Sequence, residues 1–406
     1  MTRQEIYSLS VEKLAHHHTL LLELPTGFGK TAISLQLVNH LLSTNYKDFK
    51  GSQINIMILV AKRVHKQTWK EEMTKWGGIQ HPKDGMKINI CMECYESLKK
   101  HVGEEWDIVL ADEVHHIGSE ARMYLLNKVK FCYLIGLSAT IPQKVKQYFK
   151  FRYHSEVVSC GISEAIISEI LPEPQILLFP LMLDNRAETE SWEYHPKASG
   201  PTVHATYKDC RKYKFNTNVH AIVTMTQKQK LMEYDHLIDF FKKKADFSVA
   251  AKRSWLFQAG KRLEYLADIK LPIVKDILKH LKGYRTITFC KTIEQAESAG
   301  RYCIHSKNKF GTALYEAFNK KEINHITAVN ILNENANLVD CKYAIFCNLS
   351  SSDTQVLQRL GRSLRHKSPV IIVPYYQGTR EEELLQNYIE NFNKDHIKTI
   401  HSIQEI

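Results

Sequence analysis

One short segment, residues 25–31, limits what this chain can fold into more than any other part of its sequence. The segment reads Pro-Thr-Gly-Phe-Gly-Lys-Thr, follows the apolar run 19–24, and precedes a stretch in which apolar residues recur at helical spacing. A strand, a glycine-containing loop, Lys-Thr and a helix make the layout of a phosphate-binding loop. The general pattern has glycine where this chain has Leu24, so the assignment depends on the strand and helix around the loop.

The residue types of this loop suit a nucleoside triphosphate with Mg²⁺. Glycines allow backbone N–H groups to surround phosphate oxygens, and the N-terminus of a helix adds a positive field. Lys30 is expected to reach the β- and γ-phosphates, and the Thr31 hydroxyl to hold Mg²⁺. We therefore expect ATP and Mg²⁺ as cofactors, bound at Thr26, Gly27, Phe28, Gly29, Lys30 and Thr31.

Composition limits the class of protein. The 406 residues are enough for two or three domains, and 44% hydrophobic with 24% charged residues is typical of a globular chain. No apolar stretch is long enough to span a bilayer, and the first residues lack an apolar secretory segment, so we expect no membrane partner and a cytoplasmic location. The net charge of +11 favours a polyanionic partner such as nucleic acid, although excess lysine can also be a solvated surface.

Two features have the residue types of metal sites but are disfavoured as such. Cys91 and Cys94 form a lone Cys-x-x-Cys, with no second pair at zinc spacing. His16, His17 and His18 stand where a helix should end before the first strand, a favourable place for histidine beside the helix dipole. The nine cysteines are scattered along the chain, which indicates reduced thiols.

Strand-like and helix-like segments alternate in both halves of the chain. Such alternation predicts a parallel sheet flanked by helices in each half, and hence an α/β fold. In the first half, strands are expected at 54–60, 107–111 and 133–137, with a helix at 64–76. In the second half, a helix is expected at 270–275 and strands at 286–290, 344–347 and 370–373.

The region 184–262 between the two halves has a different character. It begins with a polar stretch that we expect to be loop-like through Pro201, and it favours helix from about Val219. Its run Lys242, Lys243, Lys244 is as often a solvated helix face as a nucleic-acid contact, but neighbouring basic and aromatic residues favour the contact. The expected divisions are a first domain at 1–158, a linker with the first strand of the second domain at 159–183, a basic and mainly helical insertion at 184–262, and a second domain at 263–406.

An acidic pair, Asp112 and Glu113, directly follows the expected strand 107–111. Side chains at the carboxyl ends of parallel strands point into the cleft where α/β proteins bind ligands. Behind a phosphate loop, Asp112 can hold Mg²⁺ and Glu113 can orient and deprotonate the attacking water. The alternative is an acidic helix cap, which is common where strands lead into helices. The phosphate loop favours the catalytic interpretation.

Three side chains near the end of the chain, Gln358, Arg362 and Arg365, have the spacing i, i+4 and i+7. On a helix this spacing brings all three to one face. Arginines of the second domain could reach a γ-phosphate bound by the first and stabilise the charge that grows during phosphoryl transfer. A solvated basic helix is the alternative, but it does not explain Gln and Gly at these positions.

Taken together, these residues resemble a superfamily 2 helicase or translocase with a DExH box. Its motifs I to VI are similar here to residues 25–31, 112–115, 138–140, 286–290, 331–337 and 358–365. The resemblance covers nearly the whole chain outside the middle region. It implies two RecA-like domains in tandem, with ATP in the cleft between them and a nucleic-acid strand across the top.

The resemblance also implies roles that the residues alone do not. Gln4 stands where the family reads adenine, and Asn337 of motif V stands near the nucleotide. His115, Ser138 and Thr140 would couple ATP hydrolysis to the action on nucleic acid. Lys62 and Arg63 stand at motif Ia, a backbone contact to nucleic acid. Two positions depart from the family pattern: Ala61 replaces a proline, and Asn335 replaces a glycine. Asparagine tolerates a left-handed backbone, so that turn is expected to be kept.

The forms of motifs II and VI resemble the branch with restriction-enzyme motor subunits and DNA repair translocases. We therefore expect an ATP-dependent helicase or translocase acting on duplex or branched DNA in repair, recombination or replication. An RNA helicase of the same architecture, and an ATP-gated clamp that separates no strands, are the alternatives. A small-molecule kinase is disfavoured by the second domain and the motif VI arginines. Substrate choice would come from the 184–262 region or from a loading protein.

Overall fold

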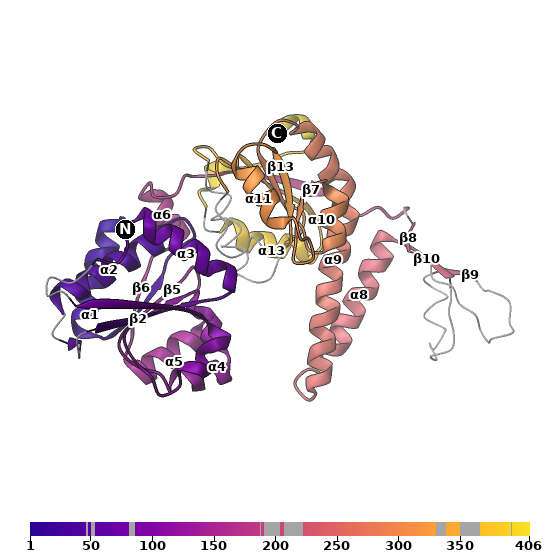
Figure 1. Cartoon of the computed structure of the whole chain (residues 1–406). Helices are drawn as coiled ribbons and strands as arrows, with labels where there is room; N and C mark the ends of the chain where they lie inside the picture. Colours follow the sequence, from indigo (N-terminus) through magenta and orange to yellow (C-terminus); the bar gives the residue numbers. More distant parts are fainter. Residues whose placement is uncertain are drawn as a thin grey trace.

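The computed structural model describes residues 1–45, 48–49, 53–80, 86–186, 188–190, 204–206, 222–329, 338–349, 366–390 and 392–406. Two parallel sheets, each with helices packed on it, form two domains joined in tandem, and a pair of long helices extends from the second (Figure 1). The expected α/β fold with two RecA-like domains is confirmed. Within the described residues, no helix is both long and apolar enough to cross a membrane.

The first domain is built on a six-stranded sheet in the order β3-β2-β4-β5-β1-β6, with every pair parallel. Its strands are β1 (Thr19–Glu23), β2 (Gln53–Val60), β3 (Lys87–Cys94), β4 (Glu105–Asp112), β5 (Lys130–Ser138) and β6 (Glu156–Ser159). Its helices are α1 (Arg3–His16), α2 (Lys30–Thr44), α3 (Arg63–Lys75), α4 (Glu120–Leu126) and α5 (Gln143–Tyr153), with 3-10 helices η2 (Tyr95–His101) and η3 (Val114–Gly118). The strands expected at 54–60, 107–111 and 133–137 are all present.

Two apolar layers hold this sheet. Side chains of α1, α2 and α3 form one cluster with one face of the sheet, and those of η2, η3, α4 and α5 form another with the opposite face. Because both faces are covered, the central strands are apolar on both sides and read as continuous hydrophobic runs. Residues 56–60 of β2, for example, are all buried.

The second domain has a seven-stranded parallel sheet in the order β12-β13-β11-β14-β15-β7-β16. Its strands are β7 (Gln175–Leu181), β11 (Thr286–Phe289), β12 (Cys303–Ile304), β13 (His325–Ala328), β14 (Tyr343–Phe346), β15 (Val370–Tyr376) and β16 (Ile397–Thr399). Helices of this domain are α10 (Ile293–Ala299), α11 (Gly311–Asn319) and α13 (Arg380–Ile389), with 3-10 helices η5 (Lys394–His396) and η6 (Ile403–Glu405). β7 reaches this sheet directly from the first domain and pairs with β15.

The short helix α6 (Ile162–Ile167) lies between the two cores. Ala165 and the nearby Leu171 pack in the first core, whereas Ile162 belongs to the second. The amino group of Met1 donates to Ser168 Oγ at 3.0 Å, so the chain start also contacts this segment. The first core therefore uses residues as far as 171.

The middle region differs from the expectation in two places. Strands β8 (Glu188–Glu190), β9 (His204–Thr206) and β10 (Ile222–Thr226) form a small sheet, so the expected loop contains a strand, and helix does not begin at Val219. The β-branched residues Ile222, Val223 and Thr224 favour a strand once partner strands are present. Helix α8 (Gln227–Lys242) begins after Thr226, whose hydroxyl accepts from Gln229 N in a capping box.

Helices α8 and α9 (Val249–His280) pack side by side as an antiparallel hairpin that extends from the second domain (Figure 1). Tyr234 and Tyr265 contact each other with ring centroids 5.9 Å apart, and Arg262 pairs with Asp235 across the hairpin. The C-terminal half of α9 buries Leu266, among others, in the second domain. One helix thus continues through the expected border at 262–263, and the border itself stays a prediction.

Candidate nucleotide and nucleic-acid sites

The loop at residues 25–29 has the backbone that a phosphate loop requires. Gly27 and Gly29 have φ of 97° and 102°, in the left-handed region that favours glycine. Gly29 is also the N-cap of α2 and places no side chain over the first turn, so the turn's N–H groups can face a ligand. Phe28 is fully buried in the first core, so its side chain anchors the loop and only its backbone can contact a nucleotide.

Two cationic side chains contact this loop. Lys30 Nζ donates to Leu24 O at 3.1 Å, and Arg3 Nε donates to Phe28 O at 2.7 Å. Leu24 itself is fully buried and its N–H donates to Ser138 O at 3.0 Å, which explains why an apolar residue can replace glycine there. Gln4, expected to read adenine, is exposed in the first turn of α1. The sequence did not single out Arg3 as a contact of the loop. Which of the neighbours Arg3 and Gln4 faces the loop depends on the rotation of α1 about its axis.

Two aromatic residues that the sequence did not single out position Asp112. Trp69 Nε1 donates to Asp112 Oδ2 at 2.8 Å, and the Tyr95 hydroxyl donates to Asp112 O at 2.7 Å. Burial, and then the charge of Asp112, raises the pKa of Tyr95 well above its usual value, so its hydroxyl stays a donor. Because Asp112 and Glu113 are only 6% and 4% exposed, this acidic pair is held in the interior rather than at a solvated helix end.

Glu113 is joined by hydrogen bonds to the segment 138–140. Ser138 Oγ lies 3.2 Å from Glu113 Oε2 and 2.9 Å from His115 Nδ1, and His115 Nδ1 lies 3.3 Å from Glu113 Oε2. The same hydroxyl lies 2.8 Å from Thr140 O. Glu113 has a φ of 51°, which is unusual for a residue with a side chain and occurs often at functional sites. The expected residues Glu113, His115, Ser138 and Thr140 therefore form one network.

The sheet order explains why this network and the phosphate loop are neighbours. β5 lies between β1 and β4, and the register pairs Glu23 with Ser138 and Asp112 with Leu137. The loop after β1, the segment after β5 and the acidic pair after β4 therefore lie at the same edge of the sheet, with strands about 4.8 Å apart. Left-handed glycines, an open helix start, the Thr31 hydroxyl and buried carboxylates fit a nucleoside triphosphate with a divalent cation.

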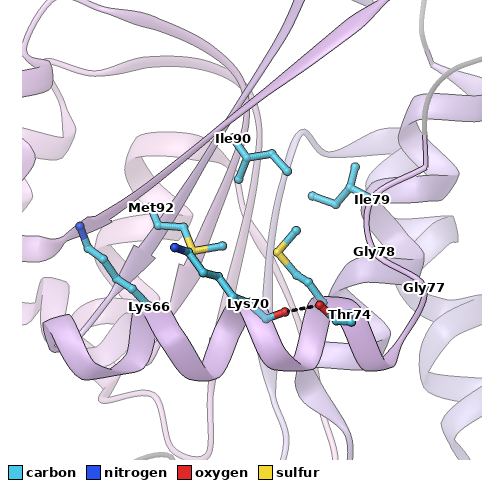
Figure 2. A pocket seen from close by; sticks show the side chains of 9 residues that line it. Lys66, Lys70, Thr74, Gly77, Gly78, Ile79, Ile90 and Met92 are labelled. Carbon is cyan, nitrogen blue, oxygen red and sulfur yellow. Dashed lines mark hydrogen bonds between the residues drawn. The ribbon is translucent and has the colours of Figure 1, made fainter.

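The other expected residues lie in different places. Gln358, Arg362, Arg365 and Asn337 are outside the described residues. Lys62 and Arg63 are exposed where β2 leads into α3, at the same edge of the sheet as the loop. Beyond them, α3 and the edge strand β3 line a groove of about 950 Å³, with Lys66 and Lys70 of the helix on one side and Ile90 and Met92 of the strand on the other (Figure 2).

Lys242, Lys243 and Lys244 are exposed at the end of α8, at the tip of the helical hairpin. Lys244 Nζ lies 3.9 Å from the ring centroid of Phe240, which is 45% exposed. By contrast, Lys261 pairs with Glu264 at 2.7 Å, and Arg262 pairs with Asp235. The tip thus carries exposed lysines without such pairing to acidic residues in the described parts of the chain, whereas Lys261 is paired within α9 and Arg262 joins α9 to α8.

A phosphate loop, an acidic pair after a neighbouring parallel strand, and a second parallel-sheet domain define a tandem RecA-like motor ATPase. Residues 2–143 match the family "Type III restriction enzyme, res subunit", and residues 269–367 match the helicase conserved C-terminal domain. These matches, with the relative described below, support a superfamily 2 helicase or translocase related to restriction-enzyme motors and repair helicases. The chain is a nucleic-acid-dependent ATPase.

One relative is similar in sequence, and two solved structures are similar in fold. The chain is similar to the DNA 3'-5' translocase XPB2 of Sulfurisphaera tokodaii, with 21% identity over 379 residues, 89% of this chain and 78% of that protein. Its fold is similar to the Pyrococcus furiosus Hef helicase domain, with a TM-score of 0.51, 14% identity, and coverage of 95% of this chain and 97% of that one. It is also similar to S. cerevisiae Dbp5 bound to RNA and ADP BeF3, with a TM-score of 0.57, 12% identity, and coverage of 98% and 89%.

Proposed function

We propose that this protein is an ATP-driven translocase or helicase whose track is duplex or branched DNA. The match of residues 2–143 to a restriction-enzyme subunit carries the proposal, because it covers the phosphate loop, the acidic pair and residues 138–140. The similarity to XPB2, which is named a DNA translocase, supports DNA in the same way. The net charge of +11 suits a polyanionic track of either kind.

The residues of the first domain have separate tasks in this proposal. Lys30 binds the β- and γ-phosphates, and Thr31 with Asp112 holds Mg²⁺, which neutralises charge on the phosphates when bound. Trp69 and Tyr95 fix the Asp112 carboxylate and backbone through the hydrogen bonds described above. Glu113 orients the attacking water and accepts its proton. Gln4 and Asn337 complete the nucleotide site.

The second domain completes catalysis and couples it to movement. Gln358, Arg362 and Arg365 stabilise the charge that grows on the transferred phosphoryl group. Hydrogen bonds among His115, Ser138 and Thr140 transmit changes at Glu113 to the segment 138–140. Lys62 and Arg63 contact the DNA backbone at the same edge of the sheet. Lys242, Lys243 and Lys244 hold DNA at the hairpin tip. The insertion or a loading protein sets which DNA structure is bound.

The proposed location is the cytoplasm. The eight cysteines within the described residues form no disulfide, which suits a reducing compartment.

The test compares ATP hydrolysis by the full chain with duplex DNA, branched DNA, single-stranded DNA and RNA of equal length. We expect duplex or branched DNA to stimulate hydrolysis most, and Lys30→Ala to abolish it. Stimulation by RNA alone would support the RNA-helicase alternative instead. Strand displacement, measured on the stimulating substrate, separates a helicase from a translocase or clamp that leaves the strands paired.

A further inference from the structure

Three side chains with metal-binding groups converge where β3 leads into η2, on the first domain. They are Cys91, Glu93 and His101, and one ligand atom of each lies within 4.8 Å of the others. The cluster is separate from the candidate Mg²⁺ residues, which follow β1 and β4. Nothing in the proposed motor function uses it.

Strand geometry explains which residues meet. Successive side chains of a strand point to opposite faces, so Cys91 and Glu93 of β3 share one face, whereas Cys94 points to the other. The 3-10 helix η2 then returns His101 to the face of Cys91, and the ring of Trp106 packs edge-on against the imidazole at 5.7 Å. Cys91 and Cys94 therefore do not act as a pair of metal ligands despite their Cys-x-x-Cys spacing, and Cys94 is outside the cluster.

In the part of the chain that the structure describes, one ring nitrogen of His101 has a carboxylate partner and the other has none. Its Nδ1 lies 2.7 Å from Glu104 Oε2, which fixes the tautomer with a proton on Nδ1 and a lone pair on Nε2. Nε2 is buried and has no hydrogen-bond partner among the described residues. A carboxylate that holds one imidazole nitrogen while the other binds a metal is the usual second-layer arrangement of zinc sites.

We propose that Cys91, Glu93 and His101 bind one zinc ion, with Glu104 as the positioning residue for His101. A thiolate, an imidazole and a carboxylate are ligands that zinc accepts, with a water completing the tetrahedron. Ligand atoms of such a site lie about 3.3–3.6 Å apart, so side chains already within 4.8 Å need only a small inward movement. The Cys91 proton leaves to solvent as the sulfur–zinc bond forms.

A cationic side chain lies beside the cluster. Lys66 Nζ lies 3.3 Å from Glu93 Oε2, so it balances part of the negative charge of the ligands. The site also lies on the element that begins with Tyr95, whose hydroxyl holds Asp112 O. Zinc would thus stiffen the segment that supports the acidic pair.

Cobalt gives a direct readout, because a thiolate bound to Co²⁺ produces a charge-transfer band in the near ultraviolet. The full chain, stripped with a chelator, is titrated with Co²⁺ and then with Zn²⁺ as competitor. We expect one equivalent of Co²⁺ to bind with the thiolate band and with the visible bands of tetrahedral cobalt, and Zn²⁺ to displace it. His16–His18 cannot produce the thiolate band, so binding at that segment is distinguished.

The variants identify the ligands. Cys91→Ser should remove the thiolate band, His101→Gln should abolish binding, and Glu104→Gln should weaken it by about 10–100-fold. Cys132→Ser, at another partly buried cysteine, and Cys94→Ser should bind as the parent does. The far-ultraviolet circular dichroism of each variant checks folding, and two independent ligand variants keep the test decisive if one misfolds. Absence of a thiolate band in the parent, or its persistence in Cys91→Ser, would overturn the proposal. Equal loss in Cys94→Ser would assign the metal to the Cys-x-x-Cys pair instead.

Discussion

The Ser138 hydroxyl lies 3.2 Å from a carboxylate oxygen of Glu113 and 2.8 Å from the carbonyl oxygen of Thr140. A hydroxyl has one proton, so it can donate to only one of these acceptors at a time. The segment 138–140 therefore has two states. In one the Ser138 hydroxyl donates to Glu113, and in the other it donates to Thr140 O within the segment. We infer that the exchange between these two hydrogen bonds links ATP hydrolysis to movement of the protein along nucleic acid.

Ser138→Ala tests the link. The change removes the hydroxyl from the network while leaving Lys30 and Asp112 in place, so ATP binding should be unaltered. Nucleic-acid-stimulated hydrolysis should fall by about 10–100-fold, which corresponds to the loss of one hydrogen bond to a charged group. Ser43→Ala is the control, because that exposed hydroxyl donates to His40 O within α2. If nucleic acid stimulates ATP hydrolysis by Ser138→Ala as strongly as it stimulates the parent protein, the inferred role is wrong.

Glu113→Gln tests the general base. Asp112 would still be held by Trp69 and Tyr95, so ATP with Mg²⁺ should still bind. Hydrolysis should fall by about 10²–10⁴, because an amide cannot accept the proton of the attacking water. Binding of a fluorescent ATP analogue and phosphate release measure the two properties. Glu120→Gln is a suitable control, since this glutamate is 91% exposed in its side chain; near-parental turnover by Glu113→Gln would show that another group is the base.

Much of this architecture could be predicted from the sequence, and the failures have physical reasons. The strands at 54–60, 107–111, 133–137, 286–290, 344–347 and 370–373 were predictable because buried parallel strands are continuous apolar runs. Short strands such as β12 (Cys303–Ile304) and β16 (Ile397–Thr399) have no such run and were not predicted. The segment Ile222–Thr226 was assigned to helix because a strand of this kind depends on partners that are distant in sequence. The supports of Asp112 come from α3 and η2, so no local spacing relates Trp69 and Tyr95 to the acidic pair.

The arginines at 362 and 365 are predicted to complete the site from the second domain. Arg362→Ala or Arg365→Ala should leave ATP affinity largely intact and reduce stimulated hydrolysis by about 10³-fold or more. Arg301→Ala, an exposed arginine of the same domain, should have no such effect. Stopped-flow phosphate release with saturating nucleic acid measures the rates.

An isolated first domain gives a second test of the same prediction. A fragment that ends at 158 would lack Ala165 and Leu171 of its core, so we choose residues 1–172. This fragment should fold and bind ATP weakly, and it should hydrolyse almost none. Robust hydrolysis by the fragment would show that the second domain contributes no catalytic group.

The hairpin tip is predicted to contact the nucleic-acid backbone. Replacing Lys242, Lys243 and Lys244 with glutamate should weaken binding and flatten the slope of log K against log salt by about 0.7–0.9 for each phosphate that is no longer neutralised. ATP binding without nucleic acid should not change. The control replaces three other exposed lysines of the second domain with glutamate, namely Lys307, Lys309 and Lys320. An equal loss in both triple variants would assign the effect to net charge rather than to the tip.

A buried ion pair in the second domain gives the last prediction. Lys270 of α9 and Glu381 of α13 pair with no exposure of either side chain. Lys270 Nζ also donates to Pro374 O at 3.1 Å, and Tyr376 N donates to Glu381 Oε2 at 3.1 Å. The pair therefore joins both helices to β15. Lys270→Met should leave a buried carboxylate without its partner and cost about 3–5 kcal/mol of stability in this domain.

The double variant Lys270→Met with Glu381→Gln separates the charge from the packing. Glutamine can still accept from Tyr376 N but needs no cation, so the double variant should lose less stability than Lys270→Met alone. Hydrogen exchange of β15 peptides measures the local free energy of opening. Lys279→Met breaks an exposed pair with Asp276 on the same helix and should cost about 0–1 kcal/mol. If Lys270→Met costs no more than Lys279→Met, burial of the pair does not determine the stability of the joint between α9, α13 and β15.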